Sequence, residues 1–150
     1  MATPVGLSAG SRSFGVAAGS GEIDLTLRAW YDADLQKLVG NVKAAAAELA
    51  SQAGVSFHSE EQDVFPATVN NPQLYGKLEK AAGQAGLTCM TPGEPFRWSE
   101  DFGHYGSRCP AFFCGIGGGE DAAGLHTPDY RWNDAVTETA IRLFSALIHI

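Results

Sequence analysis

The stretch EPFRWSEDFGHYGSRCPAFFCGIGGGEDAAGLHTPDYRWN, residues Glu94–Asn133, carries most of the information about the fold. An acidic cluster stands near its start at Ser99–Phe102, and the continuously apolar run Ala111–Ile116 predicts a buried strand. The glycine run Gly117–Gly119 follows, and His126 stands alone before the last helical pattern. The order is that of a strand leading into a polar loop. Ligands in α/β folds often lie at such carboxyl ends of strands.

A strand and a helix are predicted upstream of this stretch. Apolar and polar residues alternate over Glu22–Tyr31, which indicates a strand with one buried face. Helical spacing then follows, and the apolar positions are Leu35, Leu38, Val39, Val42, Ala46 and Leu49. We expect Asp32 or Asp34 to cap this helix, because their carboxylates can accept hydrogen bonds from its free N–H groups, and we expect Gly54 to end it.

The remaining elements are predicted from their boundary residues. A second strand is expected over Val55–Phe65, because the proline that follows it cannot donate to a ladder. Met1–Ser20 is rich in glycine, alanine and serine and is expected to be irregular or extended, with a short strand near Phe14–Val16. Asn71 and Asn133 are predicted to stand at the starts of two further amphipathic helices.

Composition limits the class of protein. The chain has 150 residues, of which 45% are hydrophobic and 18% charged, which fits a globular domain with a core. Its net charge of -7 argues against nucleic-acid binding, which requires a basic patch. No segment has the length and hydropathy of a membrane span, so no membrane partner is expected. The three cysteines form no CxxC pair, which favours reduced thiols and a cytoplasmic location.

Several short motifs in this order resemble the C-terminal end of the M20 family of metallo-amidohydrolases. The resemblance is greatest to the branch of hippurate and other N-acyl-amino-acid hydrolases. The residues that carry it are Ser99-Glu100-Asp101-Phe102, Pro110-Ala111-Phe112-Phe113, Gly115-Ile116-Gly117 and His126-Thr127-Pro128-Asp129-Tyr130. Each motif alone is weak, whereas their order and spacing before a final amphipathic helix are more specific.

The resemblance implies an α+β fold in two parts. Residues 1–66 would form a partial lid or dimerisation domain with an antiparallel strand–helix–strand unit. Residues 67–150 would form the C-terminal α/β segment of the catalytic domain. The lid of the family often mediates dimers, so a homo-oligomer is expected, and an exposed edge strand is one route to such pairing.

The resemblance also implies site residues. His126 matches a metal-binding histidine, and zinc or manganese would be the metal; the alternative is a surface-loop histidine. Glu100 and Asp101 would lie beside the substrate, although two acids at a helix start also stabilise the helix dipole. Gly117 and Gly118 would line the substrate pocket, where glycine permits close approach of a ligand, and a plain turn is the alternative.

Most of the family's catalytic apparatus is not found in the sequence. There is no His-x-Asp motif, and Glu60-Glu61 is not placed as the family's general-base pair is, so no catalytic residue is assigned. A two-metal site needs several ligands, and one histidine does not supply them. The expected function is therefore a C-terminal fragment of an enzyme that hydrolyses N-acyl-amino-acid or small peptide amides, inactive alone and binding metal weakly or not at all. The alternative is a non-catalytic dimerisation or ligand-binding module.

Overall fold

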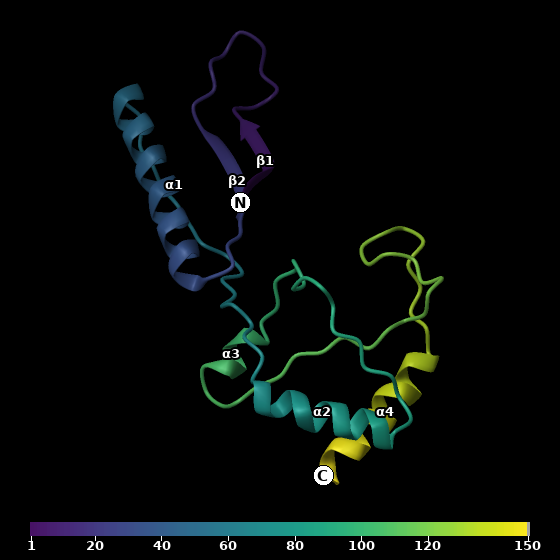
Figure 1. Cartoon of the computed structure of the whole chain (residues 1–150). Helices are drawn as coiled ribbons and strands as arrows, with labels where there is room; N and C mark the ends of the chain where they lie inside the picture. Colours follow the sequence, from purple (N-terminus) through teal and green to yellow (C-terminus); the bar gives the residue numbers. More distant parts are fainter. Residues whose placement is uncertain (150) are drawn as a thin grey trace. The chain divides into compact units, whose positions relative to one another are not determined.

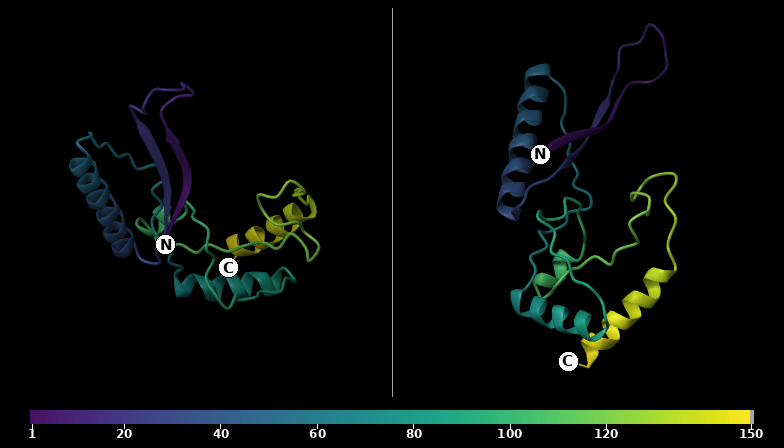
Figure 2. Two further views of the ribbon diagram at one scale, coloured as in Figure 1. Left: turned by 90° about the horizontal axis from the view of Figure 1, so that it is seen from above. Right: turned by 45° about the vertical axis from the view of Figure 1, so that its right-hand side comes forward.

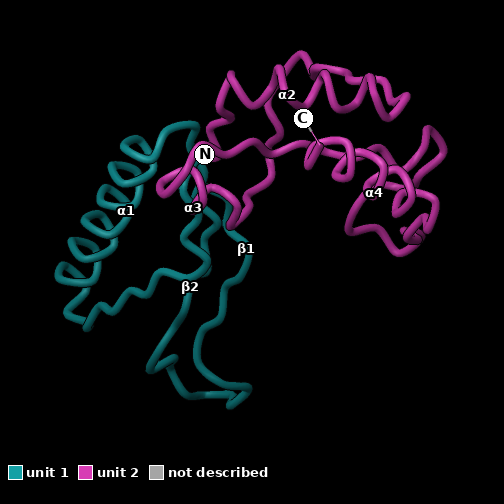
Figure 3. The backbone as a smooth tube through the Cα atoms, turned by 90° about the horizontal axis from the view of Figure 1, so that it is seen from below, with its two compact units in different colours: residues 1–67 teal, residues 68–150 magenta. Residues whose placement is uncertain are grey.

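The computed structural model describes residues 1–149, and the chain divides into two compact units, residues 1–67 and 68–150 (Figures 1 and 3). The first unit contains β1 (Ala2–Ala9), β2 (Gly21–Leu27) and α1 (Asp32–Ala53). The second contains α2 (Pro72–Gln84), α3 (Gly103–Gly106) and α4 (Ala135–Ile148). This content of helices and antiparallel strands confirms the α+β class. None of the described helices combines the length and hydropathy that a membrane span requires.

The first unit is built on an antiparallel hairpin. β1 pairs with β2 from Ala2 opposite Leu27 to Ala9 opposite Gly21, with an irregularity next to Pro4, which has no N–H to donate. The predicted strand is confirmed over Glu22–Leu27 and is wrong over residues 28–31. The buried face expected for it is also wrong, because Ile23 and Leu25 are 65% and 38% exposed. The segment before β2 is extended over β1, one of the two conformations expected for it, but the short strand expected near Phe14–Val16 is wrong, because the strand lies at Ala2–Ala9 and residues 14–16 form no ladder. The unit is therefore strand–strand–helix rather than strand–helix–strand.

Helix α1 has the predicted extent, but the cap expected from Asp32 or Asp34 is wrong, because the N-cap is Tyr31 and no side chain makes a capping hydrogen bond. Acidic residues occupy its first turn, where negative charge stabilises the helix dipole, and Gly54 ends it with a left-handed φ of 68°. The strand expected over Val55–Phe65 is wrong, since this segment forms no ladder in the described structure. Side chains hold it instead: Glu61 pairs with Lys43 of α1, and the Asp32 carboxylate accepts a hydrogen bond from the Ala67 N–H at 2.7 Å.

The core of the second unit lies where α2 and α4 cross (Figure 2). Asn71 caps α2 as predicted, because its Oδ1 accepts from the N–H groups of Gln73 and Leu74 at 2.9 and 3.2 Å. Toward the other end of α2, small residues allow α4 to approach closely. The buried residues there are Ala81, Ala82 and Leu143, with Leu78, Leu87, Ile116, Ala146 and Leu147 half-buried around them.

The buried strand expected over Ala111–Ile116 is wrong, because the described segment is neither a strand nor buried. The segment runs without helix or strand hydrogen bonding of its own, and its residues are only half-buried or exposed. The Asn70 side chain satisfies both backbone groups of Phe113. Its Nδ2 donates to the Phe113 carbonyl at 2.9 Å, and its Oδ1 accepts from the Phe113 N–H at 2.7 Å. The Phe113 ring also contacts Phe102, with centroids 5.2 Å apart. Side-chain pairing therefore fixes this segment without a ladder.

The chain buries little of its apolar surface. Its accessible area is 12236 Å². Two separate compact units of half this mass would expose about 8800 Å² together. Large apolar side chains are exposed in both units, among them Leu7, Ile23, Leu49 and Phe144. Much apolar area is thus free to be covered by further protein.

Candidate functional site

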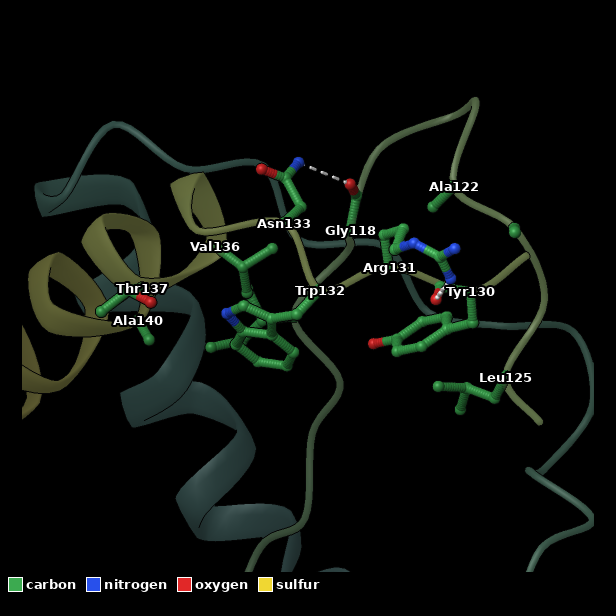
Figure 4. Close-up of a pocket in the computed structure, with 12 residues that line it drawn as sticks. Gly118, Ala122, Leu125, Tyr130, Arg131, Trp132, Asn133, Val136, Thr137 and Ala140 are labelled. Atoms are coloured by element: carbon green, nitrogen blue, oxygen red, sulfur yellow. Dashed lines mark hydrogen bonds between the residues drawn. The ribbon is translucent and has the colours of Figure 1, made fainter. Parts of the chain in front are cut away.

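A pocket of about 590 Å³ lies between the glycine run and helix α4 in the second unit (Figure 4). Gly118 and the small residues Ala122 and Ala123 form one side of it, and the first turns of α4 form another. Ile116, Leu125 and Tyr130–Asn133 complete the lining. A volume of a few hundred Å³ is typical of small-molecule sites, which are concave and mostly apolar.

Asn133 fixes the geometry of this pocket. Its Nδ2 donates to the Gly118 carbonyl at 3.0 Å, and its Oδ1 accepts from the Ala135 N–H at 3.1 Å. The second bond satisfies a free N–H at the start of α4, which is the capping role predicted for Asn133, although Asp134 occupies the N-cap position and makes no side-chain capping bond. One side chain therefore joins the glycine run to the start of the helix, and Figure 4 shows this bond across the pocket rim.

The polar chemistry of the lining comes mainly from Tyr130, Arg131 and Trp132. Arg131 is the one charged residue of the lining. Its Nη1 donates to the carbonyls of Pro128 and Tyr130 at 3.1 and 2.8 Å, which holds the guanidinium in place. In Figure 4 the Trp132 ring lies beside Val136, and the Tyr130 ring lies beside Leu125.

Of the sequence-predicted site residues, Gly118 lines the pocket and the others do not. Gly117 is exposed next to it, outside the lining. Glu100 is half-buried and Asp101 is exposed, and the Asp101 carbonyl accepts from the His104 N–H at 3.0 Å at the start of α3. The described structure therefore does not bring Glu100 and Asp101 together with Gly118 in one site.

His126 lies in an exposed turn after the pocket residue Leu125. Its φ of 64° is left-handed, a conformation that histidine adopts more readily than most residues. Thr127 holds the turn, since its N–H and its hydroxyl both donate to the Gly124 carbonyl, at 3.3 and 2.8 Å. The imidazole is thus presented on a fixed loop and is not itself part of the pocket lining.

The described residues do not fit a metal centre by themselves. Across residues 1–149 no three side chains of His, Cys, Asp or Glu come together in a way that could hold a metal ion. The thiol with a perturbed pKa is Cys114, whose pKa is raised by burial and, to a lesser extent, by the neighbouring Cys89. A raised pKa keeps a thiol protonated and makes it a poorer metal ligand and nucleophile. No chemical step through a metal is therefore derived from these residues.

Sequence reasoning missed Tyr130, Arg131 and Trp132 as pocket residues. A signal was present, because a cation flanked by two aromatic residues follows the turn at His126 directly. Only the tertiary structure shows that this run faces the glycine segment.

Comparison with known proteins decides the family. The profile described as peptidase family M20/M25/M40 matches residues 4–150. The chain belongs to this family. No solved structure matches the chain.

Curated relatives in this family are named as hydrolases. An uncharacterized hydrolase of Staphylococcus haemolyticus (strain JCSC1435) is 28% identical over 124 residues, which cover 79% of this chain and 32% of the relative. Uncharacterized hydrolases of Staphylococcus aureus are 27% identical over 135 residues in strain bovine RF122 / ET3-1 and 29% identical over 136 residues in strain USA300. Both alignments cover 87% of this chain and 35% of the relative. The chain thus spans about a third of the length of the curated relatives it matches.

Proposed function

We propose that this chain corresponds to the C-terminal portion of a metal-dependent amidohydrolase that cleaves N-acyl-amino-acid or small peptide amide bonds. The family match over residues 4–150 is the observation that carries this proposal. The hydrolase relatives, of which the chain covers about a third, support it. The order of the Glu100, Gly117 and His126 motifs supports the N-acyl-amino-acid branch.

In this proposal His126 is one ligand of a zinc or manganese site whose other ligands come from residues that this sequence does not contain. Its exposed position on a fixed turn is compatible with this role, because a ligand that completes a shared site must be accessible. Glu100, Asp101, Gly117 and Gly118 are proposed to border the substrate. Within the described chain only Gly118 reaches the pocket, so the two acids would act after association with further protein.

A chimera tests the proposal. In one of the staphylococcal relatives the matching third is replaced by residues 4–150 of this chain, and zinc- or manganese-dependent hydrolysis of N-acetyl- and N-benzoyl-amino acids is measured. We expect activity that a chelator removes. His126→Asn should abolish it, since asparagine tolerates the left-handed φ of this position but is a poor ligand for zinc.

His104→Ala is the matched control in the same chimera, because His104 is exposed and lies outside the matching motif. It should leave the rate unchanged. An inactive but folded chimera would contradict the proposed reaction. An active His126→Asn chimera would contradict the ligand assignment alone.

A second function, a non-catalytic module that dimerises, is favoured by one observation. The exposed area of 12236 Å² far exceeds that of compact units, and apolar residues of β2 and α1 such as Ile23 and Leu49 are exposed. Self-association through these surfaces would cover them, and on this ground we propose a homo-oligomer. The three free cysteines are the ground for proposing a cytoplasmic location. Sedimentation at micromolar concentration should show a dimer or larger species, and a sharp monomer boundary would contradict this.

A further inference from the structure

We infer that the pocket at Gly118 is a binding site for a small amphipathic anion, in which Arg131 holds a carboxylate and the apolar walls hold the rest of the molecule. The inference rests on the proposed function only for the choice of probe. The pocket itself, its charge and its lining are properties of this chain. They require no metal and no partner.

The first argument is the hydrogen bonding of the Arg131 guanidinium. Both N–H groups of Nη1 are directed to backbone carbonyls, those of Pro128 and Tyr130. These bonds leave Nε and Nη2, whose parallel N–H groups match the two oxygens of a carboxylate. In Figure 4 the two remaining nitrogens lie on the side of Ala122, which is part of the lining. The Arg131 guanidinium is thus held in place by its Nη1 bonds, with Nε and Nη2 directed toward the pocket.

The second argument is the charge of the lining. Arg131 is a cation, and the lining contains no carboxylate. Acidic residues do stand nearby in the sequence, at Glu120, Asp121, Asp129, Asp134 and Glu138, but none lines the pocket. Their long-range repulsion is screened over about 8 Å at physiological salt, whereas a charge-assisted hydrogen bond acts at contact. A ligand anion is therefore favoured at Arg131 itself.

The third argument is the apolar remainder. Ile116, Leu125 and Val136 contribute aliphatic surface, and Tyr130 and Trp132 contribute rings. The Trp132 side chain is accessible, with 63% of the residue exposed, so a planar group can stack on the indole without displacing the core. An aromatic or branched acyl group joined to a short carboxylate has the matching distribution of apolar surface and charge.

Nuclear magnetic resonance of the purified chain tests the inference through its three indole N–H signals. The probe is N-benzoylglycine, and its uncharged partner is N-benzoylglycine amide. We expect N-benzoylglycine to shift the Trp132 signal with a Kd of about 1 mM or tighter. The Trp30 and Trp98 signals, which belong to residues outside the lining, should stay in place. The amide should bind about tenfold more weakly, because it lacks the charge.

Variants of Arg131 complete the test. Arg131→Gln should weaken N-benzoylglycine binding about tenfold and remove the preference over the amide. Arg131→Lys should give an intermediate loss, because lysine keeps the charge without the fork. Arg108→Gln, at an exposed arginine outside the lining, should bind as the parent does.

Equal binding of acid and amide, or an unchanged Kd in Arg131→Gln, would overturn the inference, as would equal shifts of all three indole signals. These results concern binding by the chain alone. An active chimera with no binding at Arg131 would defeat this inference and leave the proposed reaction standing. Binding at Arg131 with an inactive chimera would do the reverse.

Discussion

The side chain of Asn133 joins Gly118 to helix α4: it donates to the Gly118 carbonyl at 3.0 Å while its oxygen caps the helix through the Ala135 N–H at 3.1 Å. The two bonds use opposite ends of one amide. The wall of the pocket and the start of α4 are therefore coupled, and substitutions of Asn133 can separate the two effects.

Asn133→Ala should lower the free energy of unfolding by about 1–2 kcal/mol, because it removes both a helix cap and a loop hydrogen bond. Asn133→Asp should cost less than the alanine variant, because a carboxylate still caps the helix but cannot donate to Gly118. Urea denaturation measures both. Hydrogen exchange at the Ala135 amide should be faster in the alanine variant and near normal in the aspartate variant. Equal losses in the two variants would contradict this division of roles.

The two-way pairing of Asn70 with Phe113 predicts a second effect. Asn70→Ala should destabilise the chain by about 1 kcal/mol, since it leaves the N–H and C=O of Phe113 to pair with water. The Phe113 amide should then exchange at least several-fold faster. Asn41→Ala, an exposed site on α1, is the control and should change stability by less than about 0.5 kcal/mol. An unchanged exchange rate at Phe113 would show that the asparagine does not hold this segment.

The small core predicts a clear contrast along α4. Leu143 is 7% exposed and packs against Ala81 and Ala82, so Leu143→Ala should lower the free energy of unfolding by about 2–3 kcal/mol. Ile141 is 61% exposed on the same helix, and Ile141→Ala should cost less than about 0.5 kcal/mol. Thermal denaturation followed by circular dichroism measures both. A similar cost at the two sites would contradict the placement of the core.

Burial raises the pKa of the Cys114 thiol, and this predicts its reactivity. Alkylation by iodoacetamide near neutral pH should modify the exposed Cys109 before Cys114, because only the thiolate reacts. A thiol with a raised pKa in the folded state stabilises the fold fully below its unfolded pKa. The contribution is lost as pH rises through the folded pKa, so the chain should become less stable at alkaline pH. Mass spectrometry after timed labelling measures the order in which Cys109 and Cys114 are alkylated, and faster labelling of Cys114 would contradict the prediction.

The local features of the fold could be predicted from the sequence. Helix α1 and its end at Gly54, the cap of α2 at Asn71 and the cap of α4 at Asn133 follow from helical spacing and from short-range hydrogen bonds. Strand β1 could not be found in the same way. Pro4 and Gly6 interrupt its pattern, and its ladder partner β2 lies further along the chain, with paired residues from Ala9 and Gly21 to Ala2 and Leu27.

The candidate site shows the same division. The family resemblance predicts Gly118 beside the substrate, and Gly118 does line the pocket. Arg131 and Trp132 were missed, because their shared pocket depends on a fold that brings residues 116–140 together. The Asn70 side chain pairs with the Phe113 backbone, which is distant in sequence, and a periodic pattern of apolar residues cannot reveal such a contact.

The most direct test of the central claim is the hydrolytic activity of the purified 150-residue chain in the presence of zinc or manganese. Described residues bring no three metal ligands together, and His126 alone does not fix an open metal site. We therefore predict that the chain hydrolyses N-acetyl- and N-benzoyl-amino acids no faster than buffer with the same metal, under conditions in which the chimera is active. Turnover by the chain alone that needs the metal and stops on chelation would contradict the claim that its catalytic residues lie elsewhere.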